Sequence, residues 1–97
     1  MIIPNERGFL VKGEIGFHNV LQLRAQGEAL ISAFHENCEI DLKDVREKDA
    51  SIFSLLLCWQ RFAKKNHCEL HFINAPDVLQ RMSTLFSLTH LLKISNG

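Results

Sequence analysis

Three short segments of the chain have the pattern of strands: a β-rich run at 9–15, bounded by Gly8 and Gly16, and alternating apolar and polar residues at 38–42 and 68–73. A period of two residues is typical of a β-strand that buries one face. The first of these segments fits either one strand or a hairpin of two very short strands. The second is followed by a run of charged residues at 43–48, which we expect to form a turn.

Between the alternating segments, apolar residues recur every three or four positions, which is the period of an amphipathic helix. This pattern predicts helices at 18–35 and 51–66, and a third helix that begins near Pro76 and ends near Phe86. Gly27 lies inside the first helix, where glycine costs about 1 kcal/mol relative to alanine. We therefore expect that helix to approach a strand closely at Gly27.

Strands that alternate with helices along the chain indicate βαβ units joined by right-handed crossovers. We therefore expect an α/β fold with a mixed or parallel sheet of about four strands packed against helices. The 97 residues are enough for one domain, 1–97, and too few for two. The apolar tail at 88–94 is expected to dock on this domain as a short helix or strand.

Composition excludes several classes of function. Eleven Lys and Arg residues balance eleven Asp and Glu residues, so the chain lacks the positive charge that nucleic-acid binding requires. The sequence begins without a basic region and a following apolar run, and its longest apolar stretch, 52–59, is too short to cross a bilayer. Three widely spaced cysteines indicate reduced thiols. We therefore expect a cytoplasmic protein without direct membrane insertion.

Catalytic chemistry has little support in the sequence. It contains no nucleophile elbow, no phosphate-binding glycine loop and no metalloprotease motif. Asp41, Asp44 and Asp49 follow a predicted strand and precede a predicted helix, so we interpret them as solvated acids or helix caps. We therefore expect neither an enzyme nor a bound cofactor.

One triplet of residues offers a metal-binding alternative. His67, Glu69 and His71 would share one face of a strand, and two imidazoles with a carboxylate are ligands that zinc accepts. A zinc site also needs a fourth ligand or a water in a pocket, and His and Glu are common on solvent-facing strands. The prediction is therefore that no metal is bound. Cys58 and Cys68 are interpreted as small buried hydrophobic residues.

The predicted helix 51–66 carries apolar residues on two faces. At about 100° per residue, most of them form one core stripe, whereas Phe53 and Leu57 lie on a different side beside Gln60 and Lys64. An apolar patch with a polar rim usually marks a partner-binding surface. Alternatively, the apolar C-terminal tail covers the two residues, and the sequence leaves both interpretations open.

The segment that leads into this helix resembles a motif of STAS domains, the fold of bacterial anti-sigma factor antagonists. In that motif a hydrophobic strand ends in Asp-Leu, and an Asp followed by Ser or Thr opens a helix. The corresponding residues here are Asp41-Leu42 and Asp49-Ala50-Ser51. Further segments that match the family are Leu55-Leu56-Leu57, Ala63-Lys64-Lys65-Asn66, Ile73-Asn74, Pro76-Asp77-Val78 and Leu85-Phe86-Ser87-Leu88. The resemblance covers nearly the whole chain and implies a STAS-like α/β domain.

Within the family, the short chain and the Leu-Leu-Leu helix followed by Ala-Lys-Lys are similar to the small cytoplasmic STAS subunit of an ABC-type phospholipid transporter. The resemblance implies a non-catalytic subunit that binds the ATPase subunit and reaches the permease only through it, at the periphery of the inner membrane. The helix start is expected to carry the contact through Asp49, Ala50, Ser51, Phe53, Ser54 and Leu57, with Gln60 and Lys64 at the rim.

One residue separates this interpretation from the alternative of an anti-sigma factor antagonist in a partner-switching pathway. In antagonists the residue after the motif Asp is a Ser or Thr that a kinase phosphorylates, and here that residue is Ala50. Alanine has no hydroxyl that could accept a phosphate, so we expect no phosphorylation. Ser51 is adjacent, but it would lie at a different angle on the helix start.

Overall fold

The computed structural model describes residues 1–85 and 94–95 of the chain. In chain order its elements are β1 (Ile2–Pro4), β2 (Gly8–Ile15), α1 (Val20–Ile31), β3 (Asn37–Glu47), α2 (Ser51–Lys65), β4 (Glu69–Ile73), α3 (Asp77–Leu85) and β5 (Ile94–Ser95). The predicted helix end near Phe86 and most of the predicted tail segment 88–94 lie outside the described residues.

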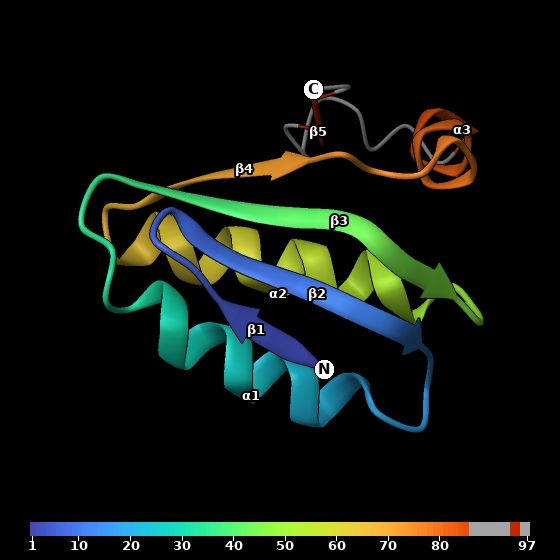
Figure 1. Ribbon diagram of the computed structural model, residues 1–97, viewed down its shortest axis with the longest axis horizontal. Helices are drawn as coiled ribbons and strands as arrows, with labels where there is room; N and C mark the ends of the chain where they lie inside the picture. The colour runs from blue at the N-terminus through green and yellow to red at the C-terminus, as the bar shows by residue number, and fades with distance from the viewer. Residues whose placement is uncertain (86–93, 96–97) are drawn as a thin grey trace.

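The five strands form one sheet in the order β1-β2-β3-β4-β5. β1 pairs antiparallel with β2, and the other neighbours pair parallel. Because β2, β3 and β4 are adjacent and parallel, right-handed crossovers place α1 and α2 on the same face, where Figure 1 shows them side by side. The predicted α/β class, with a mixed sheet packed against helices, is confirmed.

β3 is longer than the alternating pattern indicates. The turn predicted at 43–48 is wrong, because β3 continues to Glu47 and pairs with β2 along this length. A bulge in the pairing inserts one extra residue into β3. As a result Lys43 and Asp44 are both exposed, while Val45 still faces the core. The bulge therefore interrupts the two-residue period without ending the strand.

The segment at 9–15 is one continuous strand, β2, so the alternative of two very short strands is wrong. Its antiparallel neighbour is β1, which the pattern does not predict because the three residues Ile2–Pro4 are too few to show a period. Asn5 stabilises the turn between the two strands. Its Oδ1 accepts the backbone N–H groups of Arg7 and Gly8 at 3.0 and 2.9 Å.

Trp59 lies at the centre of the core, between the sheet and α1. Its side chain is fully buried, and its ring meets that of Phe9 edge to face, with centroids 5.3 Å apart. Its Nε1–H donates a hydrogen bond to the carbonyl oxygen of Arg24 at 3.2 Å. A Cβ added at Gly27 would lie 2.3 Å from Cε2 of this ring. The close approach predicted at Gly27 is therefore made to a side chain of α2, and the prediction of a strand beneath it is wrong.

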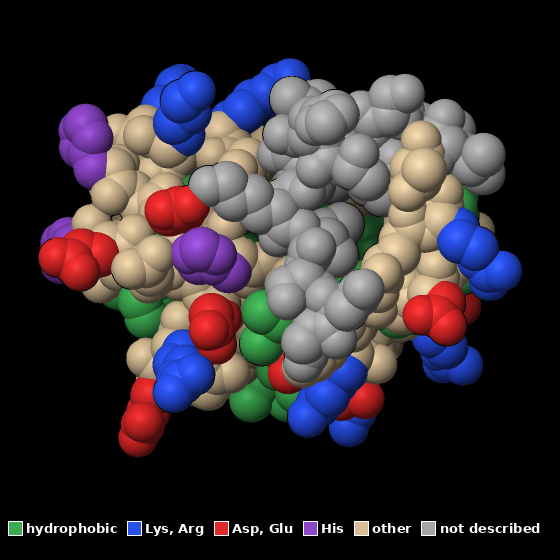
Figure 2. All heavy atoms as spheres, turned by 90° about the horizontal axis from the view of Figure 1, so that it is seen from above, with side chains coloured by type: hydrophobic (Ala, Val, Ile, Leu, Met, Phe, Trp, Pro, Cys, Tyr) green, Lys and Arg blue, Asp and Glu red, His purple; other side chains and the backbone are tan. Residues whose placement is uncertain are grey.

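The surface near β4 and α3 carries charges of both signs. Seen from that side, the described residues present Lys, Arg, Asp, Glu and His side chains with only small apolar areas (Figure 2). This mixture of charges is in line with the net charge of zero. Of the helices within residues 1–85, none combines the length and the apolar character needed to span a membrane.

Candidate partner-binding surface

The start of α2 is held in place by the carboxylate of Asp49. Its Oδ1 accepts the backbone N–H of Ser51 at 2.8 Å, and its Oδ2 accepts the backbone N–H of Phe17, in the loop before α1, at 3.0 Å. The N-cap position itself is Ala50, which has no side-chain cap. Asp49, interpreted from the sequence as a solvated acid or helix cap, acts from one position before the N-cap, and Ser51 is the first helical residue. One carboxylate therefore joins the beginnings of both helices.

These hydrogen bonds change the acidity of Asp49. Hydrogen bonding by the Ser51 side chain, followed by the backbone N–H groups of Phe17 and Ser51, holds the pKa of the Asp49 carboxyl below its usual value of 3.8. Hydrogen bonds to the ionised form of a carboxyl favour that form, which is why they lower its pKa. The nearby His18 adds a smaller effect in the same direction.

Replacing Asp49 by asparagine is expected to lower the stability of the domain at neutral pH, and this loss should shrink in acid. The pKa is lower in the folded than in the unfolded chain, so the carboxylate stabilises the fold above the usual pKa of 3.8. That stabilisation disappears as the pH falls through the lowered folded-state pKa. Urea denaturation of both proteins, from about pH 7 to about pH 3, measures the difference.

The control for the Asp49 variant is Asp44→Asn, which removes one negative charge from another exposed position. It corrects for the general effect of charge on the stability of the domain. A stability difference between parent and Asp49→Asn that stays constant across the whole pH range would contradict the role assigned to the Asp49 carboxylate.

The eight residues of the predicted contact surface differ in exposure. Asp49, Ala50, Ser54 and Lys64 are exposed, Ser51, Leu57 and Gln60 are half-buried, and Phe53 is buried. Of the two interpretations left open for Phe53, an exposed patch does not hold, because Phe53 is only 5% exposed and belongs to the core cluster. Leu57 packs against the same cluster but stays half open. The accessible part of the surface is therefore the polar start of α2 with Leu57 beside it.

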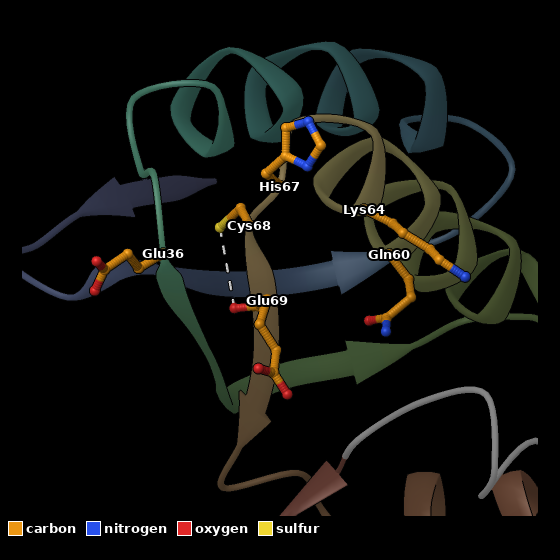
Figure 3. Close-up of a pocket in the computed structure, with 6 residues that line it drawn as sticks. All are labelled: Glu36, Gln60, Lys64, His67, Cys68 and Glu69. Atoms are coloured by element: carbon orange, nitrogen blue, oxygen red, sulfur yellow. Dashed lines mark hydrogen bonds between the residues drawn. The ribbon is translucent and has the colours of Figure 1, made fainter.

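Gln60 and Lys64 lie at a separate pocket of about 470 Å³, beside the beginning of β4. Figure 3 shows its lining side chains, which come from α2, from the residue before β3, from the turn before β4 and from the first residue of β4. Lys64 extends away from Cys68 and Glu69. The Oε1 atom of Gln60 is buried, and among the described residues it has no hydrogen-bond partner. The predicted rim thus belongs to a second concave surface, further along the helix.

Two exposed apolar residues that were not among the predicted site residues lie in the loop before α1 and in its first turn. Phe17 is 85% exposed and Leu21 is 76% exposed. Leu21 lines a pocket of about 130 Å³ between α1 and α2, together with Val20, Ser54 and Leu55. The sequence does hold a signal for Leu21, because this residue lies off the apolar stripe of its helix.

The alternative metal site at His67, Glu69 and His71 is not formed. β4 begins at Glu69, and His67 lies in the preceding turn with a φ of 58°, so the three residues do not share one strand face. Nε2 of His71 lies 3.0 Å from Oδ1 of Asn37. In the part of the chain that the structure describes, no three His, Cys, Asp or Glu side chains are grouped to hold a metal ion.

The three cysteines are free thiols. Burial raises the pKa of the Cys68 thiol and raises that of Cys38 to about 12. Both thiols are therefore protonated at neutral pH and are poor nucleophiles, and Cys68 is the buried residue that was predicted. Cys58 is only half-buried and lines the pocket between α1 and α2, so its predicted burial is correct only in part.

The parallel arrangement of β2, β3 and β4, with two helices on one face, defines a small single-sheet α/β domain. The residues that lead into α2, Asp49 and Ala50, are exposed. The family described as Mlab, STAS domain matches residues 6–93, which is most of the chain, and the chain belongs to this STAS family. The resemblance seen in the sequence is thereby confirmed. No curated protein sequence matches the chain.

Solved structures share the fold. A chain of the Acinetobacter MlaFEDB complex in an ATP-bound conformation is 24% identical, with a TM-score of 0.81 over 93% of this chain and 95% of that chain. The unphosphorylated anti-sigma factor antagonist SpoIIAA is 17% identical, with a TM-score of 0.74 over 99% and 87% of the two chains. The phosphorylated Bacillus cell fate determinant SpoIIAA is also 17% identical, with a TM-score of 0.70 over 99% and 90%.

Proposed function

We propose that this chain is a non-catalytic, MlaB-type STAS subunit of an ABC-type phospholipid transporter that serves the lipid asymmetry of the outer membrane. The observation that carries the proposal is the match of residues 6–93 to the Mlab STAS family. The likeness of 93% of the chain to a chain of the MlaFEDB complex supports it.

The proposed partner is the cytoplasmic, MlaF-like ATPase subunit of the transporter. In this role the chain acts as one unit, 1–97, and contacts the permease only through the ATPase. It is then cytoplasmic and peripheral to the inner membrane. The absence of a spanning helix within the described residues is compatible with this arrangement.

The proposed contact is centred on the start of α2. Asp49, Ala50 and Ser54 are exposed there, and the hydrogen bonds of Asp49 fix the backbone before a partner arrives. A preorganised surface loses less conformational entropy on binding. Further residues of the proposed contact are Ser51, Leu57, Gln60 and Lys64, with Phe53 packed beneath the surface.

Replacing Ala50 and Ser54 together by arginine is expected to weaken the complex with the ATPase by about tenfold or more. Both positions are exposed, so the long charged side chains would separate the two surfaces without disturbing the core. The tagged chain is co-expressed with the ATPase and permease of the same genome. Co-purification, followed by titration of the purified subunits, measures the change in affinity.

The matched control is the double variant Ser32→Arg with Ala33→Arg. These residues have the same types as the tested pair, and they are exposed at the opposite end of α1. The control should bind the ATPase like the parent, and circular dichroism should show that all variants are folded. Normal ATPase binding by the Ala50 and Ser54 variant would show that the interface does not lie at the start of α2. A parent chain that forms no complex would contradict the transporter role.

The second candidate is an anti-sigma factor antagonist, which the fold shared with SpoIIAA supports. Against it stands Ala50, which is exposed but has no hydroxyl. Incubation with an anti-sigma factor kinase of the same genome and ATP, followed by intact-mass measurement, is expected to show no added phosphate. A phosphate that is lost in Ser51→Ala would favour this second function.

A further inference from the structure

A groove runs between α1 and α2. It consists of two hollows, of about 130 and about 280 Å³. The first is lined by Val20, Leu21, Ser54 and Leu55 and the second by Glu28, Arg61, Phe62 and Lys65, with Arg24 and Cys58 common to both. Because they share two lining residues, the hollows adjoin one another along the helix pair.

One end of the groove is apolar and open. Leu21, in its lining, is 76% exposed, and Phe17, shortly before α1, is 85% exposed. The backbone N–H of Phe17 donates to the carboxylate of Asp49, so Phe17 lies at the same end of the helix pair. Large apolar side chains this exposed beside a concave surface are typical of a site that a partner covers.

The other end of the groove is positively charged. Arg61 and Lys65 are exposed one helical turn apart on α2, and within the described residues neither takes part in an ion pair. Arg24 is already paired, because its Nε lies 3.0 Å from a carboxylate oxygen of Glu28. Two positive charges therefore remain available to a ligand that lies along the groove.

We propose that the groove receives an acidic amphipathic helix of the partner ATPase. This inference rests on the proposed function and names the chemistry of its contact. Apolar side chains at helical spacing would pack against Leu21 and Val20, and carboxylates would pair with Arg61 and Lys65. Seating an amphipathic helix between two others is a common mode of peptide recognition, and the charges fix its direction.

A bilayer also combines apolar chains with negative headgroups, but the geometry favours a helix. The apolar hollow that Val20 and Leu55 line is recessed between two helices, and the ridge of side chains on a helix can enter it. A bilayer surface is flat and would meet the crests of α1 and α2 instead. Binding to vesicles is therefore an outcome that the experiment must separate from binding to a helix.

The thiol of Cys58 can report whether the groove is occupied, because it lines both hollows. Cys38 and Cys68 are buried and their thiol pKa values are raised, so N-ethylmaleimide should label Cys58 first in the native protein. Mass spectrometry measures labelling of the free chain and of the chain in its ATPase complex. The same measurement is made with a synthetic helical peptide of Leu and Glu, and with phosphatidylglycerol vesicles.

Labelling of Cys58 is expected to slow by about tenfold or more in the ATPase complex and with the acidic peptide, and to be unchanged with vesicles. The double variant Arg61→Glu with Lys65→Glu should weaken both the complex and peptide binding by about tenfold. Lys12→Glu with Lys43→Glu reverses two exposed charges on β2 and β3. This matched control should leave both affinities unchanged.

The outcomes distinguish this inference from the proposed function. Unprotected Cys58 in an intact ATPase complex, or unchanged affinity after reversal of Arg61 and Lys65, would overturn the helix in the groove and leave the transporter role standing. If the peptide protects Cys58 but the chain forms no ATPase complex, the transporter role and the ATPase as the source of the helix would both be overturned, and only the preference of the groove for an acidic helix would stand. Protection by vesicles but not by the peptide would overturn the inference in favour of a membrane surface.

Discussion

Replacing Trp59 by alanine is expected to lower the free energy of unfolding by about 3–5 kcal/mol, because it leaves a large cavity in the core. Trp59 is fully buried, and the variant loses both the ring contact with Phe9 and the hydrogen bond to the Arg24 carbonyl. Small domains have total stabilities of roughly 5–15 kcal/mol, so the variant would be close to unfolding. Urea denaturation followed by circular dichroism measures the change.

The control for the Trp59 variant is Leu21→Ala. Leu21 is 76% exposed, so its truncation should change the stability by no more than about 0.5 kcal/mol. The stability loss of Trp59→Phe should lie between those of Trp59→Ala and Leu21→Ala. Phenylalanine keeps an aromatic ring against Phe9 but loses the hydrogen bond to the Arg24 carbonyl. Equal losses for Trp59→Ala and Leu21→Ala would contradict the central position of Trp59 in the core.

Replacing Gly27 by alanine is expected to lower the free energy of unfolding by about 1–3 kcal/mol, although alanine is the better helix former by about 1 kcal/mol. A Cβ at this position would lie 2.3 Å from both Cε2 and Nε1 of Trp59. That ring is enclosed on its other sides by the core and has little room to move. Thermal and urea denaturation measure the loss.

Two comparisons test the cause of the Gly27 effect. Gln26→Ala changes an exposed neighbour on the same helix, so it reports helix propensity alone and should not destabilise. In a Trp59→Ala background the cost of Gly27→Ala should vanish, because the colliding ring is gone; this is a double-mutant cycle. An equal cost in both backgrounds would show that the Trp59 ring is not responsible.

Hydrophobic periodicity was sufficient to predict most of the fold. The helix predicted at 51–66 corresponds to α2, Ser51–Lys65, and the strand at 68–73 corresponds to β4, Glu69–Ile73. Each of these elements buries one side and exposes the other, and this one-sided burial produces the regular spacing of apolar residues in the sequence. The pattern failed where this property was interrupted, at the bulge of β3, and where the element was too short, as in β1.

The candidate site was harder to predict. The helical period gives the direction in which a side chain points around the helix axis, but it does not show which other elements cover that side chain. Phe53 does lie off the main stripe of α2, yet it is buried by tertiary neighbours. Leu21 is likewise off the stripe of α1 and is open. The position of Ser54 beside α1 depends on how the two helices pack. Ala50 could be singled out, since a local motif marks its position.

The carboxylate of Asp49 makes the two loops that precede α1 and α2 open together. Phe17 and Ser51 are far apart in the chain, yet their N–H groups share this one acceptor. A fluctuation that withdraws the side chain releases both amides at once, so their hydrogen exchange should be correlated. A ligand that leaves the Asp49 hydrogen bonds intact therefore meets the two helix starts in a fixed relative position. A ligand that displaces the Asp49 side chain frees both loops.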